Sequence, residues 1–179
     1  MQWEQERLSA LTAARAAGEV IRSHYHTRYD IDYKGKDSPV TIADREANHK
    51  IHEILHGEFP QDGWLSEETV DSPARLSCRR VWVIDPMDGT KEFIQKVPEL
   101  AVSIALVEDG HPVVGVAYNP IQEQLFWAVR GQGAWVNDRR VQVSPAAQLK
   151  DATILASRSE TQRGEWKSFS SRFQIRETG

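Results

Sequence analysis

The sequence predicts an α+β fold, a layered α/β sandwich in which N-terminal helices pack on a largely antiparallel sheet. Two observations support this prediction. Residues 3–25 and 41–55 carry apolar side chains at helical spacing. Residues 100–143 divide instead into short apolar runs separated by turn residues, which is typical of antiparallel hairpins. Helices followed by hairpins indicate a layered domain rather than alternating βα units.

Length and composition limit the classes of protein that the chain can belong to. It has 179 residues, a net charge of −4 and 40% hydrophobic residues, enough for one domain or slightly more. A second apolar strand pattern starts near Asp151, so we predict an N-terminal domain over residues 1–148 and the beginning of a C-terminal α/β domain over residues 149–179. The mild negative charge argues against binding to a nucleic acid polymer or an anionic membrane.

Localisation follows from three further features. The single Cys78 cannot form an internal disulfide, and no apolar run approaches the roughly 20 residues that span a bilayer. The N-terminal residues do not form a signal peptide, so we expect a soluble, cytoplasmic protein without a membrane anchor.

The first helix is predicted from about residue 3 to residue 25. Gly18 lies inside it and costs about 1 kcal/mol relative to alanine, so we expect it to mark a close packing contact. Tyr29, Ile31 and Tyr33 alternate with polar residues and predict a strand. Residues 34–40 are interpreted as a Gly/Pro loop.

Thr41 begins the second predicted helix. Asp44 follows three residues later, which fits an N-cap with a short-armed capping box. This structural role is a sufficient explanation of Asp44 by itself. It is also compatible with a functional role, because a helix N-terminus suits an anionic site.

A cluster of acidic residues then follows two predicted strands. Glu67 and Glu68 come after the short strand 63–66, and the polar residues 69–80 read as a surface loop. The apolar run 81–84 predicts a strand buried on both faces, with Asp85 at its end.

The turn after this strand is a candidate cation site. Pro86 and Gly89 are expected to hold Asp85 and Asp88 in one tight loop with the Met87 carbonyl between them. Oxygen ligands of this kind suit Mg²⁺. The alternative is an ordinary Asp-Gly turn with solvated carboxylates.

The remaining pattern is interpreted as all-strand, with hairpin turns at 108–111, 119–120 and 137–138, and residues 131–135 as a bend rather than a phosphate loop. Trp82, Trp127 and Trp135 are predicted to be core residues.

His52 and His56 lie four apart on a helix, but no third ligand accompanies them, so we interpret the histidines as surface or interface residues. Near the C-terminus we predict a strand at 152–156, a helix at 161–173 and a strand at 173–176.

The hexapeptide from Asp85 to Thr90 resembles the D-P-[LIM]-D-G-T signature of the inositol monophosphatase superfamily, which comprises Mg²⁺-dependent, lithium-sensitive phosphomonoesterases. Lys91-Glu92-Phe93-Ile94 and residues 34–44 are similar to its CysQ branch, the 3′(2′),5′-bisphosphate nucleotidases of sulfur metabolism. The resemblance implies the layered sandwich of the inositol monophosphatase and fructose-1,6-bisphosphatase type.

The resemblance also implies roles for individual residues. Glu67, Asp85 and the Met87 carbonyl would hold one Mg²⁺, and Asp85 with Asp88 a second, within a total of two or three ions. Thr90 would accept a hydrogen bond from the attacking water, with Asp44 polarising it. The implied catalytic residues are Asp44, Glu67 and Thr90, and the implied substrate-binding residues are Lys36, Asp88, Gly89 and Thr90.

The resemblance implies hydrolysis of a small phosphate ester, 3′-phosphoadenosine 5′-phosphate, to AMP and phosphate. An alternative is an inositol-1-phosphatase or related sugar phosphatase. A second alternative is a truncated, inactive metal-binding fragment, because the chain matches only part of the family's usual length and lacks a later W-D motif whose Asp completes the second metal site. Family members are often dimers, so a homodimer is the expected assembly.

Overall fold

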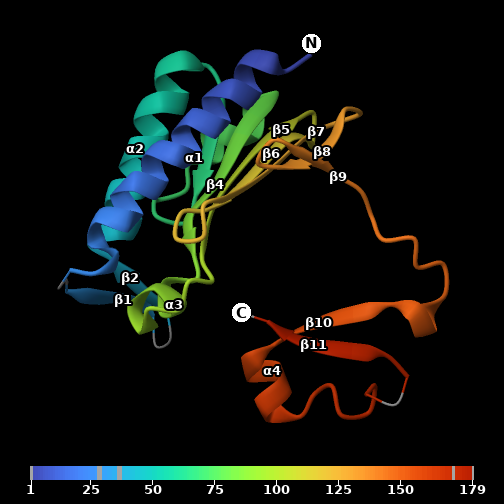
Figure 1. Cartoon of the computed structure of the whole chain (residues 1–179). Helices are drawn as coiled ribbons and strands as arrows, with labels where there is room; N and C mark the ends of the chain where they lie inside the picture. The colour runs from blue at the N-terminus through green and yellow to red at the C-terminus, as the bar shows by residue number, and fades with distance from the viewer. Residues whose placement is uncertain (1, 28–29, 36–37, 171, 179) are drawn as a thin grey trace. The chain divides into compact units, whose positions relative to one another are not determined.

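A seven-stranded sheet with two helices against one face forms the first of the two units into which the described residues divide (Figure 1). The computed structural model describes residues 2–27, 30–35, 38–170 and 172–178. The first unit comprises residues 1–141 and the second comprises residues 142–179. The layered α+β architecture predicted from the sequence is therefore confirmed.

Helices α1 (Glu4–Tyr25) and α2 (Ile42–Glu58) form the helical layer. They bury alanines and branched aliphatic side chains at helical spacing, including Ala13, Ala17 and Ile51. A Cβ atom at Gly18 would overlap the ring of Tyr118, so the predicted close contact at this glycine is confirmed.

The sheet has the strand order β3-β4-β5-β6-β7-β8-β9. Strands β3 and β4 are parallel, and each later neighbour is antiparallel, as the hairpin pattern predicts. The strand bounds are β3 Gly63–Ser66, β4 Arg80–Asp88, β5 Ala101–Glu108, β6 His111–Asn119, β7 Gln124–Val129, β8 Gly133–Val136 and β9 Arg139–Val141.

The core lies between the sheet and the helices. Along β5, Val102, Ile104 and Leu106 are at most 1% exposed, whereas Ser103 between them is exposed on the other face. This alternation is the period-2 pattern of a sheet covered on one side. The β5–β6 hairpin closes through Asp109 and Gly110 with φ values of 50° and 76°, which suits a tight right-twisted hairpin.

Three features of the sheet differ from the predictions. The run 81–84 is buried at Trp82 and Ile84 only, because its alternate side chains lie on the face without the two helices. Strand β4 does not end before Asp85 but continues through Asp88. The segment after it is not all-strand, since Thr90–Gln95 forms the short helix α3, anchored by the buried Phe93.

A two-stranded ribbon precedes α2. Strand β1 (Ile31–Gly35) pairs antiparallel with β2 (Ser38–Thr41), although residues 38–40 were predicted as loop. Pro39 is tolerated there because an outer strand of a ribbon does not need every N–H group for pairing. The prediction for Tyr29 falls outside the described residues.

The second unit contains parallel strands β10 (Thr153–Ser157) and β11 (Gln174–Thr178) and helix α4 (Arg158–Arg163). The predicted helix 161–173 is wrong in both bounds. Ser157 forms a capping box with Glu160 and so starts the helix earlier, and Gly164 ends it with a φ of 74°.

The polar segments contain two short 3₁₀ turns, η1 (Pro73–Ser77) and η2 (Leu149–Asp151). The tryptophans differ in burial. Trp82 is a core residue, but Trp127 and Trp135 are half-buried and stack on each other with ring centroids 4.2 Å apart. The prediction that all three belong to the core is therefore correct for Trp82 and met only in part for Trp127, which packs against the core while partly buried. It is wrong for Trp135, which lies beside Arg140 outside the core.

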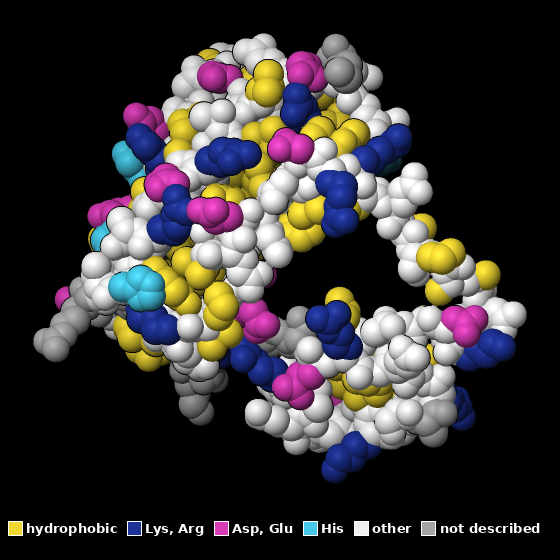
Figure 2. All heavy atoms as spheres, in the orientation of Figure 1, with side chains coloured by type: hydrophobic (Ala, Val, Ile, Leu, Met, Phe, Trp, Pro, Cys, Tyr) yellow, Lys and Arg dark blue, Asp and Glu magenta, His cyan; other side chains and the backbone are white. Residues whose placement is uncertain are grey.

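Charged side chains of both signs are interspersed over the face of the first unit that Figure 2 shows. Within the described residues, no helix is both long and apolar enough to cross a membrane.

Candidate metal centre

The acidic turn is a bulge in strand β4. Asp85 pairs with Ser103 and Asp88 pairs with Ala101, so three steps along β4 correspond to two along β5. One extra residue in a strand bends it locally and redirects its side chains. The bulge is closed by the Met87 N–H, which donates to Asp85 Oδ1 at 3.1 Å.

Gly89 is required at the end of this bulge. Its φ of 91° lies in the left-handed region, and a Cβ atom there would lie 2.8 Å from the Glu99 carbonyl oxygen. The Gly89 carbonyl accepts from the Phe93 N–H at 2.9 Å and so starts α3. This geometry places the Thr90 side chain directly beside the acidic turn.

Asp44 reaches the same place from the N-terminus of α2. Its Oδ2 accepts from the Thr41 N–H at 2.7 Å and from the Thr41 hydroxyl at 2.8 Å, which confirms the predicted capping box. The side chain is only 2% exposed. Burial raises the pKa of the Asp44 carboxyl above its ordinary value, although hydrogen bonds from Thr41 and Thr90 oppose the rise.

Thr90 connects the two elements. Its hydroxyl lies 3.0 Å from Asp44 Oδ1 and 3.2 Å from the Met87 carbonyl oxygen, within hydrogen-bond distance of both acceptors. The side chains of residues 44 and 90, far apart in the sequence, are thus in direct contact at the acidic turn.

Glu67 lies on the loop after β3, which runs parallel to β4. The Glu67 N–H donates to the Ile84 carbonyl at 3.4 Å, which ties this loop to the strand that carries Asp85. Ser66 supports the loop by donating to Asn48 Oδ1 at 2.7 Å, and Asn48 Nδ2 donates to Thr69 at 3.0 Å. Sequence reasoning missed Asn48, although it lies one turn after Asp44 on the same helix.

The carboxylates at this site interact strongly. Burial raises the pKa of Asp85 from 3.8 to about 6, and the negative charges of Glu67, Asp88 and Asp44 add to the rise. A hard divalent cation would relieve this repulsion, and carboxylate and carbonyl oxygens are its preferred ligands. The donor set therefore fits Mg²⁺, although within the described ranges no three acidic, His or Cys side chains converge into a ready-made metal cage.

A cavity of about 280 Å³ opens at the bulge. It is lined by most of the residues that the sequence identified as a site, and also by three that it did not assign. The identified ones are Glu67, Asp85, Met87, Asp88, Gly89 and Thr90, and the additional ones are Pro39, Lys91 and Glu92. The predicted substrate-binding residue Lys36 lies outside the described residues.

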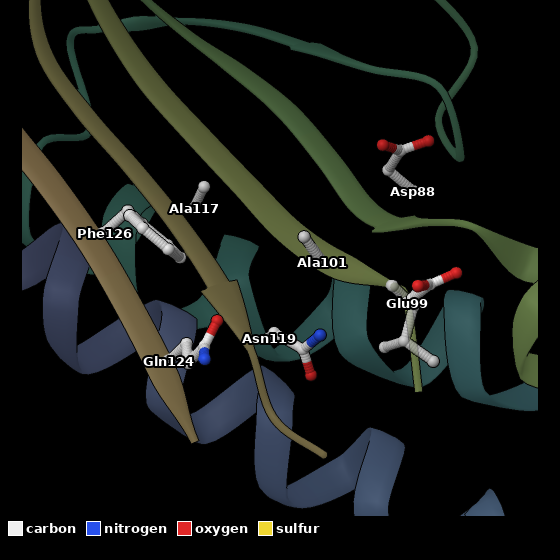
Figure 3. Close-up of a pocket in the computed structure, with 8 residues that line it drawn as sticks. Asp88, Glu99, Ala101, Ala117, Asn119, Gln124 and Phe126 are labelled. Atoms are coloured by element: carbon white, nitrogen blue, oxygen red, sulfur yellow. The ribbon is translucent and has the colours of Figure 1, made fainter. Parts of the chain in front are cut away.

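A second cavity of about 300 Å³ adjoins the first at Asp88 (Figure 3). Ala101, Ala117 and Phe126 line it along three neighbouring strands, with Glu99 and Asn119 at its rim. Asp88 lines both cavities, so a group held at the bulge has room beside it on the sheet face that lacks the two helices.

The fold and the site define a class of protein, layered α+β proteins that gather carboxylates at a bulge in strand β4, beside a helix N-terminus. The chain belongs to the inositol monophosphatase family, whose model matches residues 3–176.

Two curated relatives illustrate the relationship. Inositol monophosphatase 2 of Solanum lycopersicum is 37% identical over 148 residues, which cover 81% of this chain and 56% of the relative. The Nus factor SuhB of Escherichia coli is 39% identical over 150 residues, covering 83% of this chain and 55% of the relative. The chain thus spans little more than half the length of the curated relatives that it matches.

Solved structures share the fold. The extragenic suppressor protein suhB of Bartonella henselae has a TM-score of 0.88 and 33% identity over 98% of this chain and 71% of its own. CysQ of Bacteroides thetaiotaomicron has a TM-score of 0.77 and 32% identity over 99% of this chain and 74% of its own. The similarity extends to inositol monophosphatases, to SuhB proteins and to CysQ, so it does not select the CysQ branch.

Proposed function

We propose that the chain carries the metal-binding half of a Mg²⁺-dependent phosphomonoesterase. The observation that supports this most directly is the Thr90 hydroxyl, which lies between the buried Asp44 carboxylate and the Met87 carbonyl at a turn rich in carboxylates. Glu67, Asp85, Asp88 and the Met87 carbonyl would hold the cation. Bound there, Mg²⁺ would supply positive charge to phosphate oxygens and lower the pKa of a water molecule.

The protein side of the reaction follows from the hydrogen bonds. While the Thr90 hydroxyl donates to Asp44, its oxygen is free to accept a hydrogen bond from water. The water is thereby oriented towards phosphorus, and its proton passes to Thr90 while the Thr90 proton passes to Asp44. As the water oxygen bonds to phosphorus, the ester P–O bond breaks and the leaving alkoxide takes a proton from solvent. The raised pKa of Asp44 makes this carboxylate a stronger base than an ordinary aspartate.

An inositol or sugar phosphate is the first candidate substrate. Two lines of support favour it, the family model and the curated relatives that are named inositol monophosphatases. The second cavity beside Asp88 provides room for the alcohol part of such an ester.

The bisphosphate nucleotide 3′-phosphoadenosine 5′-phosphate is the second candidate. Lys91 supports it, because this exposed lysine lines the acidic cavity and offers a positive charge to a second phosphate group. The CysQ structure supports it at the level of the fold.

The test is phosphate release by the 179-residue chain with Mg²⁺, on inositol 1-phosphate and the nucleotide in parallel, with lithium as an inhibitor control. Preferential release from inositol 1-phosphate supports the first candidate. Preferential release from the nucleotide, reduced in Lys91→Gln, supports the second. A folded chain that neither binds Mg²⁺ nor releases phosphate would overturn the proposal. Binding of Mg²⁺ without release from either substrate would leave a metal-binding fragment and exclude both candidate substrates for this chain.

A further inference from the structure

Three histidines lie on helix α2 away from the acidic turn, and two of them are in contact. The rings of His52 and His56 stack with centroids 4.8 Å apart and an interplanar angle of 25°. Residues four apart on a helix lie on the same face, with Cβ atoms about 5–6 Å apart. Figure 2 shows histidine side chains on the side of the molecule where the helices lie.

Trp64 of strand β3 fixes the orientation of the first ring. The indole meets the His52 ring edge-on, with centroids 4.8 Å apart and an angle of 80°. The Trp64 Nε1 atom is buried and has no hydrogen-bond partner among the described residues. The His52 ring is therefore held between a packed tryptophan and a second imidazole, while His56 is exposed to solvent.

The surroundings favour the neutral form of His52. Burial lowers the pKa of its imidazole below the ordinary value, and the neighbouring His56 and His49 lower it further. Neutral imidazole is the form that binds transition metals, whereas protonation removes its lone pair.

We propose that His52 and His56 form a bidentate site for a borderline transition-metal ion such as Ni²⁺, Zn²⁺ or Cu²⁺. Imidazole suits these ions, whereas Mg²⁺ prefers oxygen ligands. With His52 held against Trp64, rotation of the exposed His56 side chain would let one ion bind a nitrogen of each ring, and water would complete its coordination. The site is chemically distinct from the carboxylate centre and lies about 12 Å further along α2 than Asp44, given 1.5 Å per residue.

A metal at this pair would restrain two successive turns of α2. The same helix holds Asp44 at its N-terminus. Ion binding would therefore stabilise the element that supports the acidic turn, without supplying a ligand to it.

The experiment is calorimetric titration of the untagged chain with Ni²⁺ in the presence of excess Mg²⁺, which occupies the carboxylate centre. We expect one Ni²⁺ per chain, with affinity reduced by about tenfold or more in His56→Gln and in His52→Gln, since even loss of an outer-shell partner costs about 10–100-fold. Glutamine is a good helix former, so these variants keep α2.

His49→Gln is the matched control, since it removes an imidazole from the same helix outside the stacked pair. It should bind Ni²⁺ as the wild type does. Three results would overturn the proposal: no Ni²⁺ binding by the wild type, unchanged affinity in His56→Gln with the fold intact by circular dichroism, or an equal loss in His49→Gln. None of them depends on phosphatase activity, so they are separate from the test of the proposed function.

Discussion

The Thr90 hydroxyl lies 3.0 Å from Asp44 Oδ1, although the two residues are 46 positions apart in the sequence. Asp44 is fixed by the capping box of α2, and Thr90 is fixed by Gly89 at the end of the β4 bulge. The contact therefore couples a helix N-terminus to the acidic turn, and both local structures must form before it exists.

Removal of the Thr90 hydroxyl should abolish most turnover. Thr90→Val keeps the shape of the side chain but cannot pass a proton to Asp44, so kcat for phosphate release should fall by about 10²–10⁴-fold. Thr90→Ser keeps the hydroxyl and should retain a substantial part of the activity. Equal rates for the Val variant and the wild type would exclude this role for Thr90.

Asp85 should make the metal-free protein less stable at high pH. Its folded pKa of about 6 lies above its ordinary value of 3.8, so the folded state holds the proton more tightly than the unfolded state does. The contribution of Asp85 to the free energy of unfolding is therefore fully present below about pH 4, its ordinary pKa. It is lost as the pH rises through the folded pKa of about 6.

The Asp85→Asn variant tests this sign. In EDTA at pH 8 it should be more stable than the wild type by about 1 kcal/mol, after discounting the shift for the exposed part of the group. Urea unfolding at pH 4.5 and pH 8 measures the difference, which should fall to about one third at the lower pH because pH 4.5 still lies above the ordinary pKa of 3.8. A destabilised variant at pH 8 would contradict the electrostatic account of the site.

Magnesium should raise the melting temperature. At an Mg²⁺ concentration about 100 times Kd, binding adds about 2.7 kcal/mol, which corresponds to a shift of about 5–10 °C for a chain of this size. Glu67→Gln should reduce the shift, whereas Glu68→Gln, its neighbour on the same loop, should leave most of it. Differential scanning calorimetry measures the Mg²⁺-induced shift in melting temperature of the two variants. A larger loss of the shift in Glu68→Gln than in Glu67→Gln would identify Glu68 as the metal ligand.

Two helical glycines should respond in opposite directions to alanine. Gly18→Ala places a Cβ against the Tyr118 ring and should destabilise the protein by about 1–3 kcal/mol. In Gly57→Ala the added Cβ has no other atom within 4 Å, so the substitution should stabilise α2 by up to about 1 kcal/mol. Chemical denaturation of both variants checks this, and stabilisation by Gly18→Ala would show that the α1–β6 contact is not tight.

The elements that the sequence predicted correctly are those encoded by local patterns. The amphipathic face of α1, the Thr41 cap and the Asp109-Gly110 hairpin all depend on residues within a few positions of each other. Their periodicity or turn chemistry is visible without knowledge of the partner element.

The features that the sequence did not predict depend on distant partners. The β4 bulge exists because β5 pairs with residues on both sides of it, and the strand β2 exists because β1 lies beside it. Asn48 supports the Glu67 loop through Ser66, a contact between a helix and a strand that no spacing rule contains. The motif could identify the acidic residues, and the resemblance implied that Asp44 acts with Thr90. Only the fold gives their direct contact at 3.0 Å.

The most direct test of the proposed metal centre is Mg²⁺-dependent phosphate release by the wild-type chain, Asp85→Asn and Asp109→Asn, each on inositol 1-phosphate. Asp109 is a matched control, because it lies on the β5–β6 hairpin and asparagine tolerates its left-handed conformation. The proposed site predicts release by the wild type and Asp109→Asn only with Mg²⁺, and a loss of about 100-fold or more in Asp85→Asn. Equal Mg²⁺-dependent rates in all three proteins would contradict it.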